Sequence, residues 1–207
     1  MILYREKPYW FFVDIPFTGS DYVYQAVKQN MPWPTVIDLN HRYSFVEKFG
    51  WMPPQWKLKS VVMVRNPYSR AVALWEDSKK DKKAREDTRK GFQRWLEIAA
   101  DRKFKTKVPW PRERNRLSCR QQACWLTSTE KVWTYTLSYE HLEYDFNCFL
   151  ADLELPAMPI KVQEDYKSTE WKSLYNKRCE TLVKYLWPQD TEIFYSQYFP
   201  PSVEARE

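Results

Sequence analysis

The predicted fold depends most on the stretch VVMVRNPYSR, which spans residues 61–70. Its first four residues are apolar and three of them are Val, which is typical of a strand buried on both faces in a parallel sheet. Arg65 follows at the carboxyl end of that strand, where open α/β sheets bind their ligands. Pro67 suits the first turn of a helix, and the amides of a helix N-terminus favour negative charge. The stretch therefore predicts a strand, an anion-binding turn and a helix.

A second stretch has the same order of parts. The apolar sequence YWFFVDI, residues 9–15, leads into the turn PFTGS, residues 16–20, and then into an expected helix that ends at Asn30. Gly19 is one of only three glycines and permits close approach of the backbone to a ligand. The turn amides and the hydroxyls of Thr18 and Ser20 can bond phosphate or sulfate oxygens. Either turn alone could be an ordinary strand-to-helix connection. Together they predict one nucleotide site with two phosphate-binding turns.

These residues resemble a known family. IPFTGS, residues 15–20, is similar to the Ile-Pro-Lys-Thr-Gly-Ser loop that holds the 5′-phosphosulfate in sulfotransferases that use 3′-phosphoadenosine-5′-phosphosulfate (PAPS). RNPYSR, residues 65–70, resembles their 3′-phosphate motif. HRYSFVEKFG, residues 41–50, resembles the segment that starts at the catalytic histidine of the carbohydrate group, which includes heparan sulfate 2-O-sulfotransferase. Looser similarity at 137–146 and 175–195 extends the resemblance from about residue 11 to about residue 198.

The resemblance implies an α/β, P-loop-like sulfotransferase fold with a central parallel sheet flanked by helices. One domain is expected over 1–207, with a frayed tail at 199–207. The implied reaction transfers a sulfonate group from PAPS to a hydroxyl of a carbohydrate or phenolic acceptor, and releases 3′,5′-bisphosphoadenosine (PAP) without a metal. His41 matches the catalytic base, and its ordinary pKa near neutrality suits proton removal. Asp14 is the competing base. The expected donor-binding residues are Pro16, Phe17, Thr18, Gly19, Ser20, Arg65, Ser69, Arg112, Arg114 and Arg116.

Two positions depart from the family pattern. Phe17 stands where the family has the lysine that contacts the transferring sulfonate, and Ala73 stands where a serine helps to hold the 3′-phosphate. Loss of one charge-assisted contact in such a site can lower the rate by roughly a thousandfold. We expect an arginine of residues 112–116 to approach the space beside Phe17 when the donor is bound. The alternative is a sulfotransferase-like protein that binds nucleotide or an anionic partner without turnover.

Positive charge is concentrated in one part of the chain. The protein has 207 residues and a net charge of +6, and residues 79–116 hold fifteen Lys or Arg against six Asp or Glu. The charged residues at 79–90 fit a solvated helix face or a loop. A basic loop at 102–116 could close over an anionic ligand. Nucleic acid is not expected as a partner, because no RNA-binding or DNA-binding module pattern accompanies the charge. A phosphotransferase is disfavoured because no Gly-Lys-Ser/Thr sequence occurs.

Other sequence features concern the location of the protein in the cell, metal binding and the role of the aromatic residues. Charged residues at 5–7 come before a short apolar stretch, which does not fit a signal peptide, and no run reaches the roughly 20 apolar residues of a membrane span. The carbohydrate enzymes that the chain resembles usually carry a membrane anchor, so the resemblance implies a soluble microbial or viral protein or a trimmed catalytic domain. We expect a cytoplasmic location and no membrane partner, and the oligomeric state stays open. The chain has only two histidines, and its four cysteines lack paired metal-ligand spacing and fit reduced thiols. The many aromatic residues are expected to fill the core. Alternatively, Trp110, Trp125 or Trp133 stacks against the acceptor.

The expected sheet has helices on both sides. Strands are expected at 9–15, 34–38, 58–65 and 131–138. Helices are expected at 20–30, 43–49, 67–78, 91–100, 117–127, 139–152, 170–186 and 189–197. Glu140 and Asp145 fall near a helix start, where carboxylates cap the chain favourably.

Overall fold

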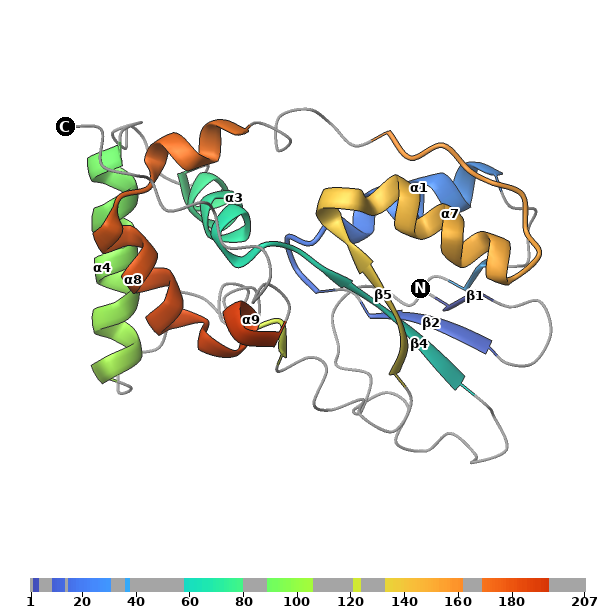
Figure 1. Ribbon diagram of the computed structural model, residues 1–207, viewed down its shortest axis with the longest axis horizontal. Helices are drawn as coiled ribbons and strands as arrows, with labels where there is room; N and C mark the ends of the chain where they lie inside the picture. The colour runs from blue at the N-terminus through green and yellow to red at the C-terminus, as the bar shows by residue number, and fades with distance from the viewer. Residues whose placement is uncertain are drawn as a thin grey trace. The chain divides into compact units, whose positions relative to one another are not determined.

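The computed structural model describes residues 2–3, 9–13, 15–30, 36–37, 58–79, 89–105, 121–123, 133–161 and 169–193. The chain divides into two compact units (Figure 1). The first unit consists of Met1–Arg65 and Cys124–Lys167, and the second consists of Asn66–Ala123 and Ser168–Glu207. The single domain expected over 1–207 stays a prediction. The helix expected at 43–49, most of that expected at 117–127 and the tail at 199–207 lie outside the described residues.

The first unit contains a sheet of five strands. The strands are β1 (Ile2–Leu3), β2 (Tyr9–Val13), β3 (Val36–Ile37), β4 (Leu58–Val64) and β5 (Trp133–Ser138). Their order across the sheet is β3-β1-β2-β4-β5. Strands β2, β4 and β5 are parallel, which confirms the expected α/β class with a parallel sheet. The two-residue strand β1 was not expected, and it pairs antiparallel with both β2 and β3.

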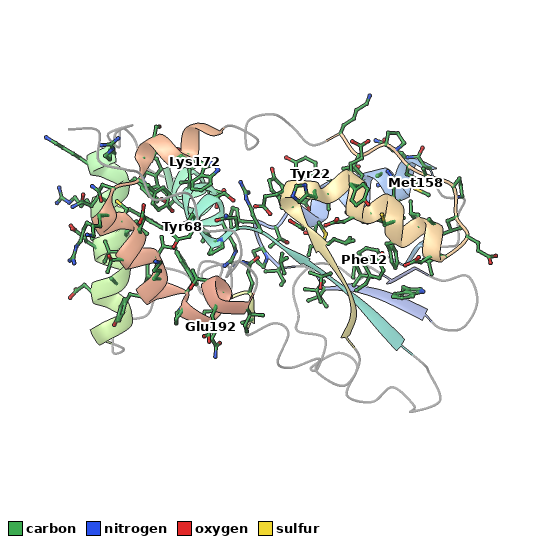
Figure 2. The ribbon with its side chains drawn as sticks, in the orientation of Figure 1. Phe12, Tyr22, Tyr68, Met158, Lys172 and Glu192 are labelled. Carbon is green, nitrogen blue, oxygen red and sulfur yellow. The ribbon has the colours of Figure 1, made fainter. Side chains whose placement is uncertain are left out.

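Helices α1 (Ser20–Asn30) and α7 (Leu142–Asp152) cover one face of this sheet (Figure 1). The side chain of Phe12 extends from β2 into the core beside α7, where it packs edge-on against Phe149 (Figure 2). Val61 and Met63 belong to the same core. Since side chains alternate along a strand, Val62 and Val64 point to the opposite face, and they are buried too. Strand β4 is thus buried on both faces as predicted, while helices over the second face stay a prediction.

The second unit is built from helices. It contains α3 (Pro67–Lys79), α4 (Arg89–Lys105), the 3₁₀ helix η3 (Thr169–Leu174), α8 (Lys177–Leu186) and α9 (Pro188–Ile193). Aromatic rings fill its core: the ring of Phe92 lies 5.3 Å from that of Trp75 and 5.1 Å from that of Tyr175, between centroids. Trp75, Phe92 and Tyr175 are therefore core residues, as expected for the aromatic residues, whereas Tyr144 and Tyr185 are exposed. Trp110 and Trp125, and the side chain of Trp133, lie outside the described part of the structure.

Several helix boundaries differ from the sequence prediction. The helix expected over 170–186 is two elements, η3 and α8, because Asn176 caps α8: its Oδ1 accepts a hydrogen bond from the Cys179 amide at 2.9 Å. The helix expected over 139–152 begins as a 3₁₀ turn, η1 (Tyr139–His141), before α7. Helix α4 extends beyond 91–100 at both ends. Among the described helices, none is both long enough and apolar enough to cross a membrane.

Candidate anion-binding site

Three parallel strands end at the same edge of the sheet. In the register of the sheet, Val13 of β2 lies opposite Val62 of β4, and Val64 of β4 lies opposite Ser138 of β5. The turn after β2, Arg65 after β4 and Tyr139 after β5 therefore lie at one edge of the first unit. This is the position where open α/β sheets bind ligands.

The turn after β2 has an unusual backbone. Phe17 has a φ of 66° and Gly19 has a φ of 89°, so both adopt the left-handed region. Glycine adopts this region at little cost, whereas an L-residue such as Phe pays about 1–2 kcal/mol. Successive amides in turns of this kind form concave anion-binding surfaces. Helix α1 begins at the next residue, and its N-terminus adds a partial positive charge.

The side chain of Thr18 stabilises the turn from inside. Thr18 is fully buried, and its Oγ1 donates a hydrogen bond to the carbonyl of Ile15 at 2.7 Å. The amide of Tyr22 donates to the carbonyl of Gly19 at 3.0 Å, which starts the first turn of α1. The hydroxyl proton of Thr18 is thus used within the turn. Contact between a phosphate and Pro16, Thr18 or Ser20 stays a prediction.

Arg65 lies against this turn. Its side chain is only 4% exposed, and its Nη1 donates to the carbonyl of Phe17 over 3.4 Å. The guanidinium carbon lies 4.1 Å from the centroid of the Tyr139 ring, within the range of a cation–π interaction. The structure therefore brings together two of the sequence-predicted parts, Arg65 and the Phe17–Gly19 turn. It adds Tyr139, which the sequence reasoning did not include in the site.

Two carboxylates bond Ser138, the last residue of β5, which directly precedes Tyr139. Asp145 accepts a hydrogen bond from the Ser138 amide at 2.7 Å, and Glu140 accepts one from the Ser138 hydroxyl at 2.9 Å. Asp145 therefore holds the backbone just before η1, whereas Glu140 bonds a side-chain hydroxyl, so its expected role as a helix cap stays a prediction. The strand position could have revealed Tyr139, because it directly follows the predicted strand at 131–138.

Ser69 belongs to the second unit, at the start of α3. Asn66 caps this helix: its Oδ1 accepts from the Tyr68 amide at 2.9 Å, and its carbonyl accepts from the Arg70 amide at 2.8 Å. The hydroxyl of Ser69 donates to the same carbonyl at 3.1 Å. Ala73, at the position of the family serine, is buried. A contact between Ser69 and a 3′-phosphate stays a prediction.

A buried ion pair in the second unit was not predicted. Nη1 of Arg70 lies 3.7 Å from Oδ2 of Asp190, and both side chains are almost completely buried. Asp190 also accepts hydrogen bonds from the amides of Gln122 and Ala123, at 2.9 and 2.8 Å. Burial raises the pKa of Asp190, and the Arg70 charge and the amide donors only partly offset that effect. This pair connects α3, α9 and residues 121–123 and has a structural role.

The remaining predicted site residues lie outside the described part of the structure. These are both candidate bases, His41 and Asp14, and the three loop arginines, Arg112, Arg114 and Arg116. Within the described residues, no group of three His, Cys, Asp or Glu side chains is placed to hold a metal ion. Cys148 and Cys179 are free thiols, and burial raises the pKa of Cys179.

Comparison of the chain with protein-family models, with curated proteins and with solved structures found no match. The geometry at the carboxyl edge of the sheet and the motifs that surround it therefore carry the proposed function.

Proposed function

We propose that this protein binds PAPS and transfers its sulfonate group to a hydroxyl of a carbohydrate or phenolic acceptor, in a P-loop-like sulfotransferase fold. One observation carries the proposal: a buried arginine, Arg65, contacts the backbone of a turn that has two left-handed residues. A fixed cation beside a concave group of amides suits a ligand with two separate anionic groups. PAPS has such groups in its 3′-phosphate and its 5′-phosphosulfate.

The proposed reaction is a direct displacement at sulfur. The acceptor oxygen forms a bond to sulfur while the bond between sulfur and the bridging phosphate oxygen breaks, and PAP leaves. His41 takes the proton of the acceptor hydroxyl, and the turn amides stabilise charge on the 5′ group. Arg65 holds the 3′-phosphate and so aligns sulfur with the acceptor oxygen. No metal is required for these steps.

A second function, nucleotide binding without turnover, is favoured by the side chains at two positions. Phe17 brings an uncharged aromatic ring to the position where the resemblance places a lysine. Ala73 is 2% exposed and offers no hydroxyl. A site that lacks both groups would hold the nucleotide through Arg65 and the turn amides, and would stabilise the transferring sulfonate poorly.

Calorimetric titration with PAP and with 5′-AMP tests the nucleotide assignment. We expect tighter binding of PAP, because only PAP has a 3′-phosphate for Arg65. Arg65→Ala is expected to weaken PAP binding by roughly 1.5–3 kcal/mol, the value of a lost charge-assisted hydrogen bond. Arg89→Ala is the matched control, because Arg89 is an exposed arginine that bonds a carbonyl, that of Ser173, in the second unit. Equal affinity of the wild type for PAP and 5′-AMP would rule out the 3′-phosphate assignment.

An acceptor screen with labelled PAPS separates the two proposed functions. Transfer of label to a sugar or phenol hydroxyl supports the sulfotransferase. Tight PAP binding without transfer to any acceptor in the screen supports the binding protein instead.

A further inference from the structure

The ring of Tyr139 contacts two parts of the candidate site at once. A Cβ atom placed on Gly19 would lie 2.5 Å from Cδ2 and 2.9 Å from Cε2 of this ring. The guanidinium carbon of Arg65 lies 4.1 Å from the ring centroid. Tyr139 itself is only 7% exposed. The ring therefore contacts both the Gly19 end of the turn after β2 and the Arg65 cation, which also reaches the Phe17 carbonyl directly. At position 19, glycine is the only residue that leaves room for the ring.

We propose that Tyr139 is a positioning residue that sets the distance between the Arg65 guanidinium and the amides of the Phe17–Gly19 turn. One side of the ring limits how far the turn can approach, and the π-face orients the guanidinium. The inference rests on the proposed nucleotide site, because it assigns to Tyr139 the spacing of the two anion-binding parts. Tyr139 acts through Arg65 and the turn.

The contacts assign this role to the aromatic ring. The atoms near Gly19 are the ring carbons Cδ2 and Cε2, and the Arg65 contact is with the ring as a whole. Phenylalanine keeps all of these atoms, whereas leucine lacks the aromatic face. Tyr139→Phe and Tyr139→Leu therefore form a matched pair that separates the ring from the hydroxyl.

The first test measures the affinity of the full chain for PAP and for 5′-AMP. We expect Tyr139→Leu to weaken PAP binding about tenfold, as expected for the loss of a desolvated cation–π contact, and to reduce the preference for PAP over 5′-AMP. Tyr139→Phe should bind PAP within about twofold of the wild type. Circular dichroism and urea unfolding identify a variant that has lost its fold. Equal losses in Tyr139→Phe and Tyr139→Leu, or an unchanged preference for PAP in a folded Tyr139→Leu, would overturn the proposal.

Gly19→Ala gives an independent test that alters no charge. This substitution strains a φ of 89° in any background, but Tyr139→Ala removes both ring atoms that the new Cβ would meet. Its penalty on PAP affinity should therefore be smaller in a Tyr139→Ala background than in the wild type. If Gly19→Ala lowers PAP affinity equally in the two backgrounds, the ring does not couple the Gly19 turn to nucleotide binding.

A spectroscopic measurement separates this inference from the proposed function. The Nε–H resonance of Arg65, assigned by its loss in Arg65→Lys, should have an upfield ring-current shift in the wild type and in Tyr139→Phe. The shift should disappear in Tyr139→Leu. A wild type that binds neither PAP nor inorganic pyrophosphate would contradict the proposed function. The ring-current shift of the Arg65 resonance would still test whether Tyr139 orients the guanidinium. An Arg65 resonance without a ring-current shift in the wild type would contradict the role.

Discussion

Phe17 combines a left-handed backbone, with a φ of 66°, with a bulky aromatic side chain. Such residues seldom adopt this region, and their conformation is held only where the surroundings fix it. Two contacts fix it here: the Phe17 carbonyl accepts a hydrogen bond from Arg65, and Thr18 is bonded to Ile15. The turn thus keeps two left-handed residues although its side chain at position 17 has no charge.

Phe17→Lys tests how the site obtains positive charge beside the sulfonate. Because we expect an arginine of residues 112–116 to supply that charge, a lysine should repel it and lower transfer activity by about tenfold, or roughly 1.4 kcal/mol. The measurement is the rate of label transfer from PAPS, with Phe17→Met as the uncharged control. A faster Phe17→Lys variant would instead show that the wild-type site lacks its cation and would favour the binding protein.

At the scale of elements, Asp190 connects α9 to α3 through Arg70 and to residues 121–123 through two backbone amides. Asp190→Asn leaves the Arg70 charge buried without its carboxylate, and an amide side chain cannot accept at both of its ends. Because burial outweighs the attraction of Arg70 for the carboxylate, the main cost is one buried donor left without an acceptor, and we expect a loss of about 1–3 kcal/mol in the free energy of unfolding at neutral pH. Urea unfolding measures it, and Glu192→Gln, an exposed change on the same helix, is the control and should have little effect.

The pH dependence of this difference follows from the direction of the Asp190 pKa shift. Burial raises the folded-state pKa above its ordinary value of 3.8, so the folded protein binds this proton more readily than the unfolded chain does. Its contribution to stability is therefore largest below about pH 4 and falls as the pH rises through the folded pKa. The advantage of the wild type over Asp190→Asn should thus be larger near pH 4 than at pH 7. The opposite slope would show that Arg70 and the amides outweigh burial.

Sequence patterns predicted those elements whose signal lies within one segment. The Val-rich residues 61–64 predicted β4, and Pro67 predicted the start of α3. The spacing of Val23, Ala26 and Val27 fits the buried side of α1. Strand β1 was missed, because two residues, Ile2 and Leu3, are too short to show a period. The break before α8 was missed because Asn176 acts through a local capping bond inside an otherwise helical pattern.

The candidate site was predictable to the extent that its parts follow predicted strands. Gly19 and Arg65 each follow an apolar run, and the structure places their segments at one edge of the sheet. The place of Tyr139 beside Arg65 could not be predicted without the strand order, because the pairing of β4 with β5 brings its ring to Arg65. The pair of Arg70 and Asp190 joins residues that are far apart in the sequence, and no local pattern marks it.

On the scale of the whole molecule, the chain passes from the first unit to the second between Arg65 and Asn66, inside the stretch that decides the fold. The net charge of +6, with its excess of Lys and Arg over 79–116, favours encounter with anionic ligands in general, and the proposed donor is one. Donor binding and acceptor activation are separate tasks in the proposed reaction. They should respond differently to substitution.

The proposed base gives the clearest case, because the chain has only two histidines, His41 and His141. If His41 removes the acceptor proton, His41→Ala should lower turnover by roughly a hundredfold or more while PAP affinity stays nearly unchanged. The pH profile of turnover should also lose its limb near neutrality, since that limb reports the imidazole. His141→Ala, at an exposed position in η1, is the matched control and should keep the limb. Unchanged turnover in His41→Ala would assign proton removal to Asp14 or to the acidity of the acceptor itself, which a phenol can supply and a sugar hydroxyl cannot.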